Sequence, residues 1–196
     1  MNGDYSFNQR WHLNSQRYVY MEVISAGYLE QQKELHENPN YGVASLAFAS
    51  FVAKIAKENK IRSICDYGAG KKRLLQGLKS AGLSGFRYLP YDPAFPEYGE
   101  PEAAEMVCCI DVLEHVEPNY VAPTISVLAG LTQKVGFFSI HMGPAGKTLS
   151  DGRNAHLIQQ PTSWWLPRLC EHFEIKSLQQ HNLYGKGFWV IVTPKA

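Results

Sequence analysis

The sequence predicts an α/β fold in which a mostly parallel β-sheet has helices on both faces and an antiparallel last strand. Short apolar segments alternate along the chain with longer segments of helical periodicity. The segment MVCCI, 106–110, is apolar throughout, which is typical of a strand at the centre of a parallel sheet. Near the C-terminus, two strand-like segments are separated only by Tyr184, Gly185 and Lys186, a spacing that indicates a hairpin.

Composition indicates one globular domain. The 196 residues are 45% hydrophobic and 19% charged, and 19 Lys and Arg nearly balance 18 Asp and Glu. With a net charge of +1, the protein as a whole does not attract nucleic acid or membranes electrostatically. Binding of nucleic acid would need a local basic patch such as Lys71, Lys72 and Arg73. The four cysteines lack CxxC spacing, and no signal peptide or apolar stretch of roughly 20 residues is evident. These features favour a cytoplasmic protein without a membrane partner.

The first two segments are expected to be helical. Residues 1–40, rich in aromatic side chains and ending in the turn signature HENPNYG, are expected to form a helical lid or arm. Residues 41–196 are expected to form the main domain. At its start, segment 41–60 carries apolar residues at the i, i+3, i+4, i+7 spacing of an amphipathic helix: Phe48, Phe51, Val52 and Ile55.

The remaining elements alternate in type. Strands are expected at 61–66, 85–92, 106–110, 135–142, 174–183 and 187–192. Between them, helices are expected after residue 73, across 121–128 and around SWWLPRLCEHF, 163–173. A polar loop fills 143–160.

The stretch RSICDYGAGKKRLL, 62–75, ends a strand in Asp66-x-Gly68-x-Gly70 and opens a helix, so a ligand can lie against bare backbone there. A phosphate-binding P-loop would need a Ser or Thr after Gly-Lys, and the stretch has none. A dinucleotide site would want a third glycine near Arg73. S-adenosylmethionine (SAM) carries no phosphate. Its site needs open backbone at the first turn, which Asp66, Gly68 and Gly70 supply, and acids for its ribose hydroxyls and ammonium group, for which Asp92 is placed.

The turn DYGAG, the acid Asp92 and the phrase CIDVLEHVEP together resemble the class I, Rossmann-like SAM-dependent methyltransferases over about residues 41 to 193. The resemblance implies an enzyme that transfers a methyl group from SAM, and a sheet that usually has seven strands, the last antiparallel. The residues expected to bind or cover the donor are Asp66, Gly68, Gly70, Asp92, Asp111, Tyr41 and Gly42.

The chain departs from that family in three places. Lys72 replaces the third glycine of the first motif, which is expected to narrow the space at the amino acid end of the cofactor. Only eighteen residues, 93–110, contain the third-strand region and the central strand, so that region is expected to be shortened or to lack its helix and strand. No obvious acid is placed to bind the adenine amine.

Ligands of this fold lie at the carboxyl ends of the strands, so residues that follow the strands are candidates for contact with the methyl acceptor. Three of them are histidines, which can accept a proton from a hydroxyl or amine near neutral pH. The expected catalytic residues are Glu114, His115, His141, Arg153 and His156. A role in stabilising the loop stays open for His115. The acceptor, a small molecule or a nucleic-acid component, is not identified.

Two alternatives stay open. The small-RNA 3′-terminal 2′-O-methyltransferases use a Glu-x-x-Glu-His segment and a distant histidine as metal ligands, and the chain is similar at Asp111, Glu114, His115 and His156. A metal-dependent RNA 3′-terminal 2′-O-methyltransferase is therefore one alternative. The other, of a different class, is a SAM-binding or regulatory partner subunit without turnover.

Overall fold

The computed structural model describes residues 13–14, 17–18, 22–183 and 185–195. They contain a six-stranded sheet in the order β4-β3-β5-β6-β8-β7 and a separate two-stranded ribbon. The sheet strands are β3 (Ser63–Tyr67), β4 (Arg87–Tyr91), β5 (Ala104–Ile110), β6 (Thr132–His141), β7 (Phe173–His181) and β8 (Gly187–Pro194), and the ribbon pairs β1 (Leu13–Asn14) with β2 (Arg17–Tyr18).

Neighbouring strands from β4 to β6 are parallel, whereas β8 is antiparallel to both β6 and β7. The predicted α/β class, mostly parallel sheet and antiparallel last strand are therefore confirmed. The helices are α1 (Ala26–Glu37), α2 (Ser45–Glu58), α3 (Arg73–Ser80), α4 (Val121–Leu131) and α5 (Thr162–His172), with short 3-10 turns η1 (Pro96–Tyr98), η2 (Leu113–His115) and η3 (Pro118–Tyr120).

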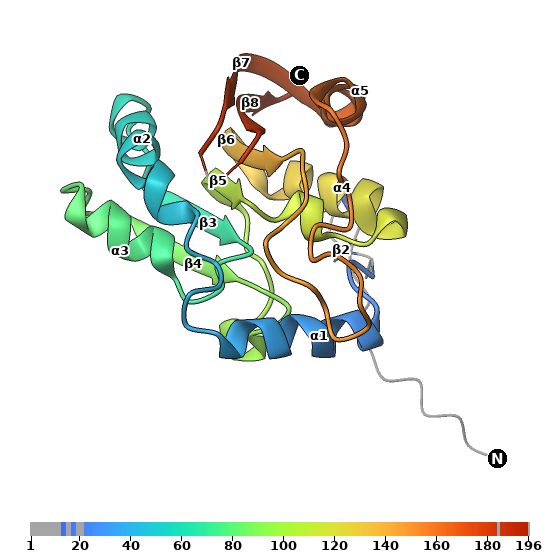
Figure 1. The fold of residues 1–196 in the computed structure, drawn as a ribbon. Helices are drawn as coiled ribbons and strands as arrows, with labels where there is room; N and C mark the ends of the chain where they lie inside the picture. The colour runs from blue at the N-terminus through green and yellow to red at the C-terminus, as the bar shows by residue number, and fades with distance from the viewer. Residues whose placement is uncertain (1–12, 15–16, 19–21, 184, 196) are drawn as a thin grey trace.

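Two apolar cores lie on opposite faces of the sheet. Along β5, Val107 and Cys109 pack with α4 and α5 on one face, while Met106 and Cys108 pack with α2 and α3 on the other. Figure 1 shows this arrangement, with α1 crossing one end of the sheet. Because both faces are covered, β5 is buried along almost its whole length, which explains its uninterrupted apolar sequence.

The sheet lacks one strand that the resemblance implied. Among the described residues it has six strands, and β4 forms the edge at which a seventh would pair. The connection from β4 to β5, residues 92–103, contains only the turn η1, because so few residues leave no room for a helix and a further strand. The expected shortening of the third-strand region is thus confirmed. Pro90, which cannot donate a ladder hydrogen bond, is tolerated because β4 lies at the edge.

The structure describes only part of the N-terminal segment that is expected to form a lid. Within 1–40 the structure describes the ribbon and α1, and residues 1–12, 15–16 and 19–21 lie outside the described residues. The lid role of this segment stays a prediction. Among the described helices, none combines the length and the apolar character that a membrane span requires.

Candidate active site

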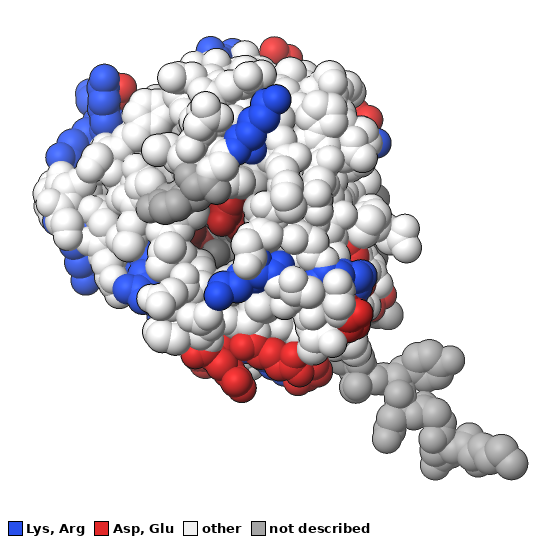
Figure 2. Space-filling view, viewed as in Figure 1, with Lys and Arg blue, Asp and Glu red and all other residues white. Residues whose placement is uncertain are grey.

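A pocket of about 360 Å³ lies at the carboxyl ends of β3 to β6, beneath α1. Most of its lining comes from five segments: the turn after β3, the residues after β4, the residues after β5, the end of β6 with the loop that follows it, and α1 with the residues on either side of it. Thr124 of α4 also lines it. Figure 2 shows acidic atoms inside a hollow of the surface and basic side chains beside it. All seven predicted donor-binding residues line the pocket: Tyr41, Gly42, Asp66, Gly68, Gly70, Asp92 and Asp111.

The turn after β3 presents backbone to this pocket. Gly68 and Gly70 have φ angles of +81° and +45°, a conformation that side-chain-bearing residues rarely adopt. A Cβ on Gly68 would lie 2.3 Å from Cγ2 of Val112. The N–H groups of Gly68 and the next residue donate to the carbonyl of Tyr91, at 2.7 and 2.9 Å, and that of Gly70 donates to Asp92 Oδ2 at 2.8 Å. The turn is therefore fixed to the end of β4.

Two buried acids flank the turn. Asp92, 8% exposed, also accepts a hydrogen bond from the N–H of Ala94 at 2.9 Å. Asp66, 3% exposed, accepts one from the hydroxyl of Tyr88. Burial raises the pKa of Asp66 to about 7, against an opposing effect of the Tyr88 hydrogen bond. Burial also raises the pKa of Asp92, although its two backbone hydrogen bonds oppose this.

The three cations that open α3 contact the chain itself. Lys71 Nζ donates to the carbonyl of Asn38 at 2.9 Å, and Arg73 donates to that of Pro39 at 3.2 Å. Lys72 adopts a φ of 56°, and its Nζ lies 4.0 Å from the centre of the Tyr98 ring. Lys71 and Arg73 thus anchor the linker between α1 and α2. Lys72 is not among the lining residues, so it does not narrow the pocket as its sequence position suggested.

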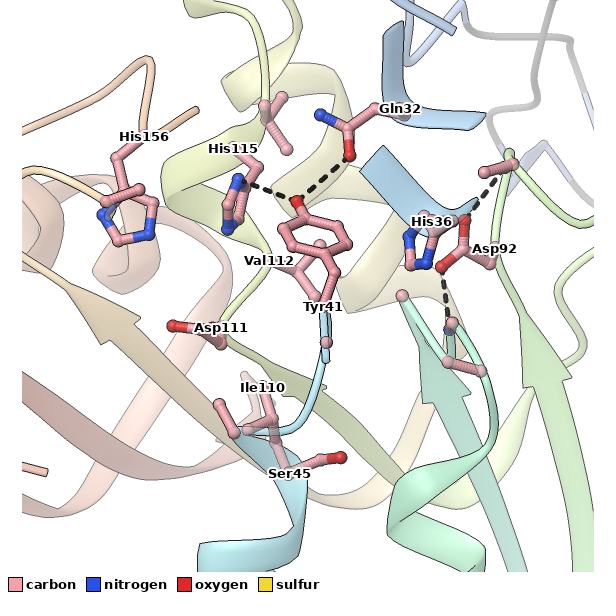
Figure 3. A pocket seen from close by; sticks show the side chains of 18 of the residues that line it. Gln32, His36, Tyr41, Ser45, Asp92, Ile110, Asp111, Val112, His115 and His156 are labelled. Carbon is pink, nitrogen blue, oxygen red and sulfur yellow. Dashed lines mark hydrogen bonds between the residues drawn. The ribbon is translucent and has the colours of Figure 1, made fainter. Parts of the chain in front are cut away.

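Helix α1 contributes residues that the sequence analysis missed. Tyr28, Gln32 and His36 line the pocket, and their i, i+4, i+8 spacing places them on one face of the helix. The His36 ring lies against the turn, since a Cβ on Gly70 would be 3.0 Å from its Cε1 (Figure 3). Burial and the nearby Lys71 charge lower the pKa of His36 to about 4. The spacing was a usable signal, but nothing in the sequence indicated which face of the helix meets the pocket.

Three histidines gather at the other end of the pocket. The ring centres of His115 and His156 are 4.7 Å apart, and those of His141 and His156 are 5.4 Å apart. His115 Nδ1 lies 2.8 Å from the carbonyl oxygen of Ala155, and His156 Nδ1 lies 2.7 Å from that of Gly143. Because a carbonyl only accepts, Nδ1 carries the proton in each ring. The Nε2 atom of each neutral ring therefore keeps its lone pair.

Burial favours the uncharged form of the His115 and His156 rings. It lowers the pKa of His115 to about 4, although the Asp111 carboxylate has the opposite effect. Burial likewise lowers the pKa of His156, against the effect of the hydrogen bond to Gly143. Neutral imidazoles with a free lone pair can accept a proton from a bound molecule or bind a metal ion.

Glu114 lies behind the histidines and not in the pocket wall. Its side chain is 0% exposed, and Oε1 accepts the backbone N–H of His141 at 2.6 Å. Burial raises its pKa well above the usual range, and the nearby Asp111 carboxylate raises it further. This hydrogen bond joins the segment after β5 to the end of β6.

Arg153 lies outside the pocket wall. Its guanidinium pairs with Asp151 at 2.6 Å and lies 5.7 Å from the ring centre of Tyr28. The structure therefore brings His115, His141 and His156 together at the pocket, whereas Arg153 is not among the residues that line it.

No protein-family model and no curated protein sequence matches this chain, but solved structures do. A 1,6-didemethyltoxoflavin-N1-methyltransferase of Burkholderia thailandensis, with S-adenosylhomocysteine bound, matches with a TM-score of 0.61 at 14% identity, over 96% of this chain and all of that one. This chain has the class I, Rossmann-like methyltransferase fold. The resemblance is thus confirmed at the level of the fold.

Two further methyltransferases share the fold. The mitomycin 7-O-methyltransferase MmcR matches with a TM-score of 0.61 at 13% identity, over 84% of this chain and 60% of that chain. The magnesium protoporphyrin IX methyltransferase of Synechocystis, also solved with S-adenosylhomocysteine, matches with a TM-score of 0.52 at 12% identity, over 87% of this chain and 95% of that chain.

The raised pKa of Asp66 predicts a pH-dependent effect of the substitution Asp66→Asn. The folded protein holds this carboxyl proton up to about pH 7, whereas the ordinary value of the side chain is 3.8. The folded state therefore loses stability relative to the unfolded state as pH rises from about 4 to 7. Asparagine never ionises, so the gain in free energy of unfolding on substitution should grow across this range and level off above it.

Denaturant unfolding of both proteins between pH 4.5 and 8 measures that gain. Asp151→Asn is the matched control, because Arg153 lowers the pKa of exposed Asp151 and its carboxylate is ionised throughout. A gain from Asp66→Asn that is the same at every pH would contradict the prediction.

Proposed function

We propose that this protein is a SAM-dependent methyltransferase that acts on a hydroxyl or amine of a small molecule. The observation that carries the proposal is a single pocket with two chemically different ends. One end has bare glycine backbone beside the buried acid Asp92, and the other has His115 and His156 with their free Nε2 atoms. A volume of about 360 Å³ is within the range of small-molecule sites, about 300 to 1,000 Å³.

The donor end fits SAM in its chemistry. The carboxylate oxygens of Asp92 each accept one backbone hydrogen bond and each keep a second lone pair for a ribose hydroxyl. Gly68 and Gly70 line the pocket without side chains of their own, with Val112 packed against Gly68 and His36 against Gly70. We assign the remaining predicted donor contacts to Asp66, Asp111, Tyr41 and Gly42, which line the same pocket.

The acceptor end provides proton acceptors. In the transfer, the bond from sulfur to the methyl carbon breaks as the acceptor oxygen or nitrogen forms a bond to that carbon. The acceptor proton passes to Nε2 of His115 or His156. Alignment of donor and acceptor can contribute on the order of 7 to 11 kcal/mol, and a general base typically adds a factor of about 10² to 10⁴. Alignment of donor and acceptor therefore contributes more to the rate than a general base does.

The structural neighbours support a small-molecule acceptor. By their descriptions, the three neighbours act on 1,6-didemethyltoxoflavin, on mitomycin and on magnesium protoporphyrin IX. The RNA alternative gains no support from the basic patch, because Lys71 and Arg73 are bonded to carbonyls of the α1–α2 linker. The regulatory-subunit alternative differs in turnover alone and is an outcome of the labelling experiment below.

Asp92→Asn tests the donor end. Loss of the carboxylate charge should weaken binding of SAM and of S-adenosylhomocysteine by roughly 1 to 3 kcal/mol, because the hydrogen bonds from ribose hydroxyls lose their charged acceptor. Calorimetric titration measures the change, with Glu174→Gln at an exposed position of β7, on the opposite edge of the sheet from β4, as the control that keeps wild-type affinity. Equal affinities in wild type and Asp92→Asn would show that Asp92 does not contact the donor.

Methyl-labelled SAM tests turnover without presuming the acceptor. Incubated with a cell extract, the wild-type protein should produce a labelled small molecule that mass spectrometry detects. His156→Gln should slow labelling by at least about tenfold, since general-base catalysis typically contributes 10²-fold or more, while binding of S-adenosylhomocysteine persists. Binding of both nucleosides without any labelled product would instead favour the non-catalytic subunit.

A further inference from the structure

The loop that follows β6 brings a lysine to the acceptor end of the pocket. Residues 144–147 line the pocket, as does His156 from the returning part of the same loop. Asn154 Oδ1 accepts the N–H groups of Ala145 and His156, each at 2.9 Å, and its Nδ2 donates to the carbonyl of Ala145 at 2.9 Å. One amide side chain therefore fixes the segment that ends in Lys147 relative to the proton acceptor His156.

Lys147 keeps its hydrogen-bond donors for a bound molecule. Its side chain is exposed, and among the described residues neither its ammonium group nor its backbone N–H has a hydrogen-bond or ion-pair partner. Within the same ranges, the N–H of Gly146 has no acceptor either. Other cations near the pocket are engaged by the chain: Lys71 and Arg73 by carbonyls of the α1–α2 linker, and Arg153 by an ion pair.

A second lysine lies beside the same end of the pocket. Lys186 directly precedes β8, and its carbonyl accepts the N–H of Met142, the residue after β6, at 2.9 Å. The Lys186 side chain is exposed and has no ion-pair partner in the part of the chain that the structure describes. Figure 2 shows basic side chains on more than one side of the hollow. Charges of one sign around a cleft raise the local concentration of oppositely charged molecules.

The sign of the charge changes between the mouth of the pocket and its interior. Figure 2 shows acidic atoms inside the hollow, and the side chain of Asp111, which lines the pocket, is only 23% exposed. An anionic group is therefore repelled from the interior and attracted to the lysines at the mouth. A neutral hydroxyl or amine has no such restriction and can reach the Nε2 atoms of His115 and His156. This arrangement favours an acceptor with two chemically different ends.

We propose that Lys147, assisted by the charge of Lys186, binds an anionic group of the methyl acceptor at the mouth of the pocket. The acceptor is then a small molecule with a carboxylate, phosphate or sulfate at one end and the methyl-accepting hydroxyl or amine at the other. An ammonium group offers three donors, and these anions are ionised at neutral pH. This assignment rests on the proposed function. SAM also has a carboxylate, but the link through Asn154 holds the Lys147 segment beside His156, at the acceptor end.

The charge of the acceptor can be tested before the acceptor is identified. The small molecules of a cell extract are separated on an anion-exchange resin at pH 7, and the retained fraction is eluted with a volatile salt and dried. Each fraction is incubated with the wild-type protein and methyl-labelled SAM. The labelled product should form from the retained fraction. A labelled product that forms from the unretained fraction alone would overturn the assignment.

Lys147→Gln measures what the lysine contributes. The amount of retained fraction that gives half the maximal labelling rate should rise roughly three- to thirtyfold, the range between an exposed ion pair and a hydrogen bond to a charged group. The maximal rate should change little, because Lys147 does not contact the reacting atoms. Lys147→Arg keeps the charge and should restore most of the affinity. Lys176→Gln, at an exposed position of β7, is the matched control and should behave as wild type.

Calorimetric binding of S-adenosylhomocysteine to the same proteins separates the two sources of an anion. Its affinity should be equal in wild type and Lys147→Gln. If Lys147→Gln instead weakened nucleoside binding and left the half-saturating amount of extract unchanged, Lys147 would bind the carboxylate of the donor and the assignment would be wrong. Wild-type half-saturation in Lys147→Gln with unchanged nucleoside binding would also refute it. A wild-type protein that binds no nucleoside would overturn the proposed function and this assignment together, so the two failures are distinguishable.

Discussion

The close approach of the turn after β3 to the segment after β5 is the constraint on which the pocket depends. Gly68 lies so near Val112 that no side chain fits between them, and its φ of +81° favours glycine independently. The adjacent N–H groups are bonded to Tyr91 and Asp92 at the end of β4. One turn therefore fixes the ends of three neighbouring strands relative to one another, and the pocket forms where those strands end.

Electrostatics divide the pocket into two regions. Around the turn, the buried carboxyls of Asp66 and Asp92 are held by hydrogen-bond donors from the protein and offer acceptors to a ligand with hydroxyl or ammonium groups. Around His156, donors are directed to backbone carbonyls and the lone pairs face inward. The first region is suited to a nucleoside with an amino acid tail, and the second is suited to a proton or a cation.

The sequence predicted those parts of the site that depend on local chain geometry. Gly68, Gly70 and Asp92 were recognisable because a strand, a tight turn and a helix follow one another in a fixed order. The clustering of His115, His141 and His156 followed from the rule that the carboxyl ends of parallel strands meet at one edge of a sheet. The short connection between β4 and β5 was predictable from its length alone.

Contacts between segments that are distant in the chain could not be predicted from the sequence. The carbonyls that engage Lys71 and Arg73 belong to the α1–α2 linker, so the same residues read as a free basic patch until that linker is placed. His36 enters the pocket only because α1 docks across it. Arg153 stood beside His156 in the sequence, but its pairing with Asp151 keeps its guanidinium outside.

The most direct measurement of the central claim is a crystal structure of the protein with S-adenosylhomocysteine. The ribose hydroxyls should lie within about 2.7 to 3.2 Å of the Asp92 carboxylate, with the nucleoside against Gly68 and Gly70 and its sulfur directed toward His115 and His156. A nucleoside bound away from the turn after β3, or a turn still covered by His36 with no ligand density beside it, would contradict the claim.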